Sequence, residues 1–182
     1  MERDEILHWF EEHPEVVHGD ASELLTRCER SVRRHAREDA WLAAKHYVER
    51  RRHAEGATGG MHASEAYVAH EVCHQLADEL SCHEPHPGAG DEDHLAGGPV
   101  KAAIDGKGWE VLASWILEVA REEEHKTWLE ITRYTNRLAR ELIEKHHLSD
   151  DCSFDHSKCF GEVAARISHI LEADFERHAF PH

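Results

Sequence analysis

The chain has 182 residues, of which 40% are hydrophobic and 32% are charged, and its formal net charge at pH 7 is −16. This composition is typical of one globular domain or of two small helical halves. The net charge disfavours direct nucleic-acid binding, because phosphate contacts depend on lysine and arginine side chains that release counterions. No apolar run approaches the ~18 residues that a membrane-spanning helix requires, so we expect no membrane segment.

The cysteines and the first residues predict a cytoplasmic protein with reduced thiols. The chain has five cysteines, and no two of them form a C-x-x-C pair. Residues 1–5 are charged and lack the apolar stretch of a secretory signal peptide. The chain also has 19 histidines. Imidazoles ordinarily titrate near about pH 6.5, so both a pH-sensing role and a simple compositional bias are open.

Helical periodicity predicts an all-α protein with a short first helix, residues 2–13, and four principal helices. Pro14 is expected to end the first helix, and Asp20 or Ser22 to cap the second, which runs to about residue 52. The expected inward-facing residues of the second helix are Leu24, Leu25, Cys28, Val32, Ala36, Trp41, Leu42 and Tyr47. The third helix is expected over residues 64–83.

An acidic stretch rich in proline and glycine, residues 84–108, predicts a linker or loop between the third and fourth helices. It separates an N-terminal helical half, residues 1–83, from a C-terminal half, residues 109–182, and the two halves either stay separate or pack as one domain. The fourth helix is expected over 109–147, with a break or solvated bend at the acidic run 122–124. The last helix follows from about residue 155.

The two halves resemble each other when the chain is shifted by 87 residues. Aromatic and basic positions then coincide, among them Trp41 with Trp128, Tyr47 with Tyr134 and Arg50 with Arg137. This similarity between the two halves predicts two related helical hairpins that bury their apolar stripes against each other as a four-helix bundle. Shared heptad-like patterning without duplication explains the matches equally well.

The third helix carries the motif with the clearest chemical interpretation. Its apolar stripe consists of Ala69, Val72, Cys73, Leu76 and Leu80. His70, Glu71 and His74 form an H-E-x-x-H sequence, in which two imidazoles spaced i, i+4 hold zinc and the glutamate acts as general base. No third zinc ligand follows in the sequence, and the two histidines lie roughly 100–150° from the apolar stripe, on the expected solvent side.

Residues 65–76 begin with the pattern acidic-x-x-Val-x-His-Glu-Val and are preceded by an arginine-rich helix and a loop. This arrangement resembles region 2 of the sigma-70 family of RNA polymerase factors. In that family the polar face of the second helix docks on the polymerase clamp. The resemblance implies a degenerate or regulatory relative with RNA polymerase as partner. It also implies a docking face here, consisting of His70, Glu71, His74, Gln75 and Asp78.

A di-iron bundle is a further interpretation, because E-x-x-H pairs on core-facing helix positions hold two irons in four-helix bundles. The matching pairs are Glu15/His18, Glu122/His125 and Glu144/His147, and His169 with Asp174 is a looser candidate. The leading interpretation is a non-enzymatic protein-interaction module, with a zinc-dependent hydrolase as the alternative. Homo-oligomerisation is compatible with each of these interpretations.

Overall fold

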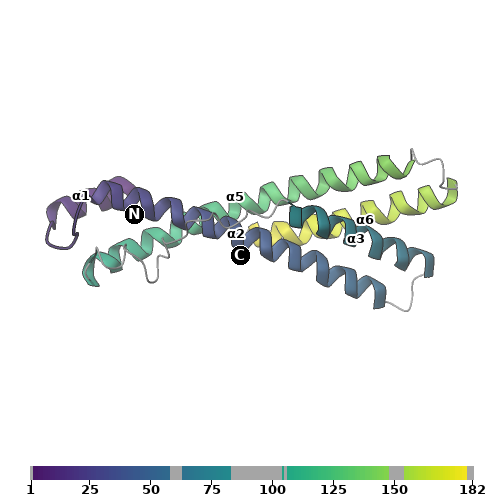
Figure 1. The fold of residues 1–182 in the computed structure, drawn as a ribbon, viewed down its shortest axis with the longest axis horizontal. Helices are drawn as coiled ribbons and strands as arrows, with labels where there is room; N and C mark the ends of the chain where they lie inside the picture. The colour runs from purple at the N-terminus through teal and green to yellow at the C-terminus, as the bar shows by residue number, and fades with distance from the viewer. Residues whose placement is uncertain (1, 58–62, 83–103, 105, 148–153, 180–182) are drawn as a thin grey trace. The chain divides into compact units, whose positions relative to one another are not determined.

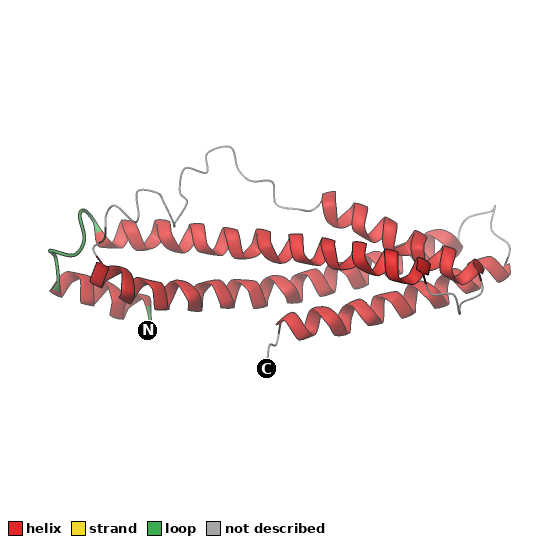
Figure 2. Ribbon diagram, turned by 90° about the horizontal axis from the view of Figure 1, so that it is seen from below, coloured by secondary structure: helices red, strands yellow, loops and turns green. Residues whose placement is uncertain are grey.

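The structure is a computed structural model that describes residues 2–57, 63–82, 104, 106–147 and 154–179. These residues form α1 (Arg3–Glu12), α2 (Ala21–Ala57), α3 (Ala63–Cys82), α5 (Gly106–His147) and α6 (Phe154–Ala179) (Figure 1). Within these ranges there is no β-strand, and the only β-pairing is an isolated bridge between Val17 and Ile104 (Figure 2). The predicted all-α class is therefore confirmed. None of the described helices has an apolar stretch that would reach across a bilayer.

The helix ends follow the predicted signals. The Asp20 carboxylate accepts hydrogen bonds from the backbone N–H groups of Ser22, at 2.8 Å, and Glu23, at 3.1 Å, and so caps α2. In α1, a capping box joins the side chains of Glu2 and Glu5 to each other's backbone N–H groups. The helix ends at Glu12, just before Pro14. α2 continues beyond the predicted end at residue 52, to Ala57.

The chain forms two compact units. Unit 1 consists of Met1–Glu38 and Pro85–Glu124, and unit 2 consists of Asp39–Glu84 and His125–His182. The helices α2 and α5 each contribute a segment to both units, so each unit draws on the first and the second part of the sequence. The sequence-based division into 1–83, 84–108 and 109–182 stays a prediction, and most of the loop 84–108 lies outside the described residues.

Unit 1 has its own hydrophobic core between α1, the first part of α2 and the first part of α5. The buried members are Ile6, Phe10, Val16, Val17, Leu24, Leu25, Cys28, Val32, Ile104, Leu112, Trp115 and Val119. Gly108 lies against this core, because a Cβ atom at that position would come within 2.3 Å of Val16 Cγ1 and 2.6 Å of Ile104 Cγ2. The first turn of α5 therefore packs closer to its neighbours than a residue with a side chain allows.

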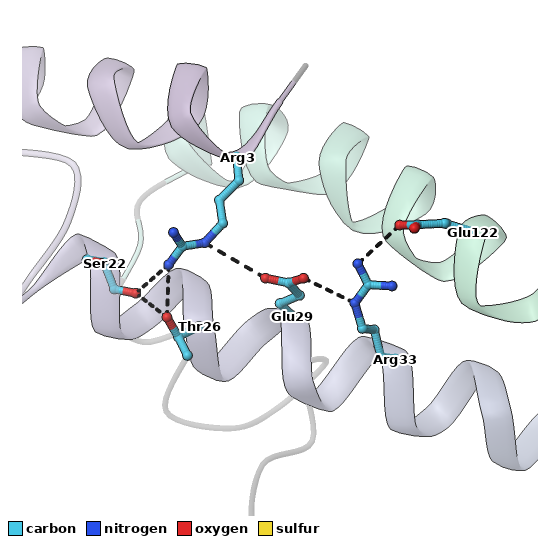
Figure 3. A network of polar contacts seen from close by, with 6 residues as sticks. All are labelled: Arg3, Ser22, Thr26, Glu29, Arg33 and Glu122. Atoms are coloured by element: carbon cyan, nitrogen blue, oxygen red, sulfur yellow. Dashed lines mark hydrogen bonds and ion pairs between the residues drawn. The ribbon is translucent and has the colours of Figure 1, made fainter. Parts of the chain in front are cut away.

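A chain of ion pairs joins the three helices of unit 1 (Figure 3). The guanidinium of Arg33 pairs with Glu29 at 3.1 Å, with Glu122 at 3.1 Å and with the buried Glu123 at 3.2 Å. Arg3 on α1 lies 3.8 Å from Glu29. The break expected at residues 122–124 is wrong, because α5 is a continuous helix there, and the alternative of a solvated bend stays a prediction. Arg33, about 90 residues earlier, pairs with this acidic run.

Unit 2 has a second core, to which α2, α3, α5 and α6 all contribute, and α3 packs against α6. The predicted stripe of α3 is confirmed, since Ala69, Val72, Cys73, Leu76 and Leu80 are all buried. Of the expected inward set of α2, Leu24, Leu25, Cys28, Val32 and Trp41 are buried. Ala36 and Tyr47 are partly buried, and Leu42 is 39% exposed. Leu42 follows the buried Trp41 and is turned about 100° from it around the helix, away from the core.

Candidate functional site

The outward face of α3 is a single stripe of exposed and partly exposed side chains. Tyr67, His70, His74 and Asp78 follow one another at helical spacings of three or four residues, opposite the buried stripe. Tyr67 is 67% exposed, the side chain of His74 is 46% exposed and that of Asp78 is 69% exposed. His70 is partly exposed. The predicted docking residues thus lie on the same helix as a large exposed aromatic side chain.

Two local contacts order the polar groups of this face. His74 Nδ1 lies 3.4 Å from Asp78 Oδ2, one helical turn further along, and the two form an ion pair when the imidazole is protonated. The amide of Gln75 donates a 2.6 Å hydrogen bond to Glu71 Oε1. Glu71 and Gln75 are both partly buried beside the exposed stripe. The face therefore carries hydrogen-bond donors, hydrogen-bond acceptors and the Tyr67 phenol on successive turns of α3.

Within the described residues, the H-E-x-x-H motif has no third metal ligand beside it. A catalytic zinc site takes three protein ligands and keeps one position open for water or substrate. Across the described part of the chain, no three His, Cys, Asp or Glu side chains come together as a metal-ligand group. His74 instead points to Asp78, and Glu71 accepts its hydrogen bond from Gln75. We derive no reaction step through a metal from this motif.

The di-iron pairs do not face a core together either. Glu15, His18, Glu144 and His147 are exposed. Glu122 pairs with Arg33 in unit 1, while the Nδ1 atom of His125 lies at hydrogen-bonding distance from the carbonyl oxygen of Ala179 in unit 2. His169 is exposed and lies beside Glu172, whereas Asp174 is buried. These residues therefore make structural contacts that differ from those of an inward-facing carboxylate cluster.

No family model, no curated protein and no solved structure matches this chain.

Tyr67 lies on the outward face of α3 but was not among the predicted docking residues. The sequence spacing indicates this position, because Tyr67 precedes His74 by seven residues and both side chains therefore lie on one side of the helix. Aromatic residues are usually expected in the core, but Tyr67 is opposite the stripe that contains Leu76 and Leu80. An exposed tyrosine among polar groups is typical of protein-binding surfaces.

The described cysteines hold no disulfide. Cys28 and Cys73 are buried in the two cores, Cys82 is exposed at the end of α3 and Cys159 is partly exposed on α6. Cys152 lies outside the described residues. No disulfide joins any two of these four described cysteines, and the reduced state of the thiols stays a prediction.

Proposed function

We propose that this chain is a helical protein-interaction module that docks through the outward face of α3, and that its partner is RNA polymerase. The observation that carries the proposal is the exposed Tyr67 in line with His70, His74 and Asp78. Tyrosine contributes large contact area at a small entropic cost, and it is enriched among the residues that dominate binding energies. The polymerase partner comes from the resemblance of residues 65–76 to sigma-70 region 2.

The proposal includes the arrangement that supports this face. We infer that the segments of unit 2 form a four-helix bundle of two related hairpins, with α3 held by its buried stripe and by its packing on α6. A helix fixed in this way binds without the entropic cost of ordering its backbone. The net charge of −16 suits a basic protein surface as the partner, and a cytoplasmic location belongs to the same proposal.

Charge reversal on the α3 face tests the proposal. We expect the double variant His74→Ala/Asp78→Lys to bind purified RNA polymerase core enzyme about tenfold more weakly than the wild type, a loss of ~1.4 kcal/mol. The matched control is His169→Ala/Glu172→Lys, which removes an exposed histidine–carboxylate pair of the same kind from α6. The control should bind like the wild type.

The two parts of the proposal fail separately. A wild-type chain that does not bind the polymerase removes the polymerase as partner. A wild-type chain that binds, with the α3 variant and the α6 control weakened equally, removes the α3 face as the docking surface. Circular dichroism and thermal unfolding of each variant establish that the fold is intact before binding is measured.

A further inference from the structure

Unit 2 contains a cationic hollow between α2 and α6 that the α3 face does not use. The hollow has a volume of about 480 Å³ and is lined by Tyr47, Arg50, Arg51, Ala54, Asp174 and Arg177. Three arginines and one aspartate therefore line this hollow, in a chain whose net charge is −16. We propose that this hollow binds the phosphoryl group of a small phosphate monoester.

The carboxylate in the hollow is compensated by its neighbours. The Asp174 side chain is 9% exposed, and its Oδ2 atom accepts a short hydrogen bond from the Tyr47 hydroxyl. Its Oδ1 atom lies 3.0 Å from Arg177 Nη2. Both carboxylate oxygens thus have a protein partner, and Arg50 and Arg51 also line the hollow. An incoming dianion meets more positive than negative charge there.

Arg50 is positioned by an aromatic side chain of the same helix. The Arg50 guanidinium carbon lies 5.5 Å from the centre of the Tyr47 ring, within the range of a cation–π contact. Tyr47 is in turn fixed by its bond to Asp174 and by edge contact with the ring of Phe175. Planar guanidinium groups match the geometry of phosphate oxygens and are weakly hydrated, so arginines held in place bind phosphate better than flexible lysines.

A second Tyr–Arg pair in the same unit shows what is particular to this hollow. The Arg137 guanidinium carbon lies 5.1 Å from the centre of the Tyr134 ring, as Arg50 does over Tyr47. Arg137 pairs with Glu141 at 3.7 Å, and burial together with the charge of Glu79 raises the pKa of Tyr134. The Tyr–Arg contact is therefore common to both places, but its surroundings are acidic at Tyr134 and basic at Tyr47.

An adjoining hollow of about 500 Å³ provides room for the organic part of the ester. It shares Tyr47 and Arg50 with the cationic hollow and is otherwise lined by Ala43, His46, Glu49, His53 and His178. His178 is stacked on Trp128, with 4.8 Å between the ring centres. A flat ligand group attached to the phosphoryl group therefore meets aromatic and imidazole side chains.

Titration with inorganic phosphate and with phenyl phosphate, followed by ³¹P NMR at constant ionic strength, tests the proposal. We expect the wild type to bind both, and phenyl phosphate about threefold or more tightly than inorganic phosphate, because its ring enters the adjoining hollow. The variants Arg50→Gln and Arg51→Gln should each weaken binding by about fivefold or more. The matched control Arg137→Gln removes the same charge and the same type of cation–π contact elsewhere, and should stay within about twofold of the wild type.

The outcomes that overturn the proposal are distinct. Absence of phosphate binding by the wild type, or equal losses in Arg50→Gln and Arg137→Gln, removes the site, since only non-specific charge would then be at work. Equal or weaker binding of phenyl phosphate removes the assignment to an ester. The α3 variants used to test polymerase binding leave this hollow intact, so the two proposals fail independently.

Discussion

The contact between Tyr47 and Asp174 joins two residues 127 positions apart, and neither residue was expected to meet the other. The sequence places Tyr47 in an apolar helix stripe and offers Asp174 with His169 as a loose candidate for a di-iron site. In the structure the phenol hydroxyl and Arg177 both bond to the buried carboxylate. A buried charge is tolerated when its oxygens are hydrogen-bonded, so this tyrosine has a structural role that its apolar ring alone does not reveal.

Replacing that hydroxyl tests its contribution to stability. We expect Tyr47→Phe to lower the free energy of unfolding by about 1–3 kcal/mol, because one oxygen of the buried Asp174 loses its donor. Urea denaturation measures the change. The matched control is Tyr67→Phe, which removes a hydroxyl from the exposed face of α3 and should stay within roughly 0.5 kcal/mol of the wild type. Equal effects of the two substitutions would show that the Tyr47–Asp174 bond contributes nothing specific.

The same tyrosine gives a pH-dependent prediction. Burial, and then the hydrogen bond to Asp174, raise the pKa of Tyr47 above its ordinary value. The folded protein therefore holds the phenol proton more tightly than the unfolded chain, and this part of the stability is complete below about pH 10 and is lost as the pH rises through the folded-state pKa. The stability difference between the wild type and Tyr47→Phe should shrink above about pH 10. A difference that grows with pH would contradict the assigned direction.

At the level of the element, features of a helix that depend on residues close together in the sequence could be predicted. Features that depend on residues far away in the sequence could not. The buried stripe of α3 was predicted residue by residue, because five apolar positions repeat with the helical period. Asp20 was one of the two residues predicted to cap α2, the other being Ser22, and the structure has Asp20 as the cap. The continuity of α5 through residues 122–124 was not predicted, and the acidic run there pairs with Arg33, about 90 positions away.

The candidate sites also differ in how far the sequence predicts them. Helical spacing was enough to place His74 and Asp78 on one face of α3, and the structure has them 3.4 Å apart. The hollow around Tyr47 could not be predicted, because its arginines come from α2 and α6 and no spacing within either helix indicates that they meet. Chemistry built within one helix is readable in the sequence, whereas chemistry built between helices requires their packing.

The start of α5 allows a test of packing with two neighbouring glycines. A Cβ atom at Gly108 would collide with Val16 and Ile104, whose branched side chains are stiff, whereas one at Gly106 meets nothing within 4 Å. We expect Gly108→Ala to destabilise the protein by about 1–3 kcal/mol despite the better helix propensity of alanine. Gly106→Ala should be neutral or stabilising by up to about 1 kcal/mol. Thermal unfolding of both variants is the measurement, and a stabilising Gly108→Ala would contradict the close packing of unit 1.

At the level of the whole molecule, the two units have hydrophobic cores with no residue in common. Leu25 and Leu76 are fully buried, the first in unit 1 and the second in unit 2. Removing either side chain should create a cavity that costs about 2–5 kcal/mol. The helix α1 belongs to unit 1 alone, while α3 and α6 belong to unit 2 alone.

Hydrogen exchange can therefore tell the two cores apart. We expect Leu25→Ala to speed amide exchange mainly in α1, and Leu76→Ala to speed it mainly in α3 and α6, because local opening follows the core that has been weakened. Exchange measured amide by amide in both variants provides the comparison. If each variant speeds exchange equally in α1 and α6, the two units open as one cooperative body and their cores are not independent.

The proposed role of the whole chain depends on one helix face, and the affinity of the Tyr67→Ala variant for RNA polymerase core enzyme tests it most directly. Tyr67 is largely exposed and contributes little to the core, so its removal should leave the fold intact. We expect the dissociation constant to rise about tenfold or more relative to the wild type. An unchanged dissociation constant for a folded Tyr67→Ala variant would contradict docking through the outward face of α3.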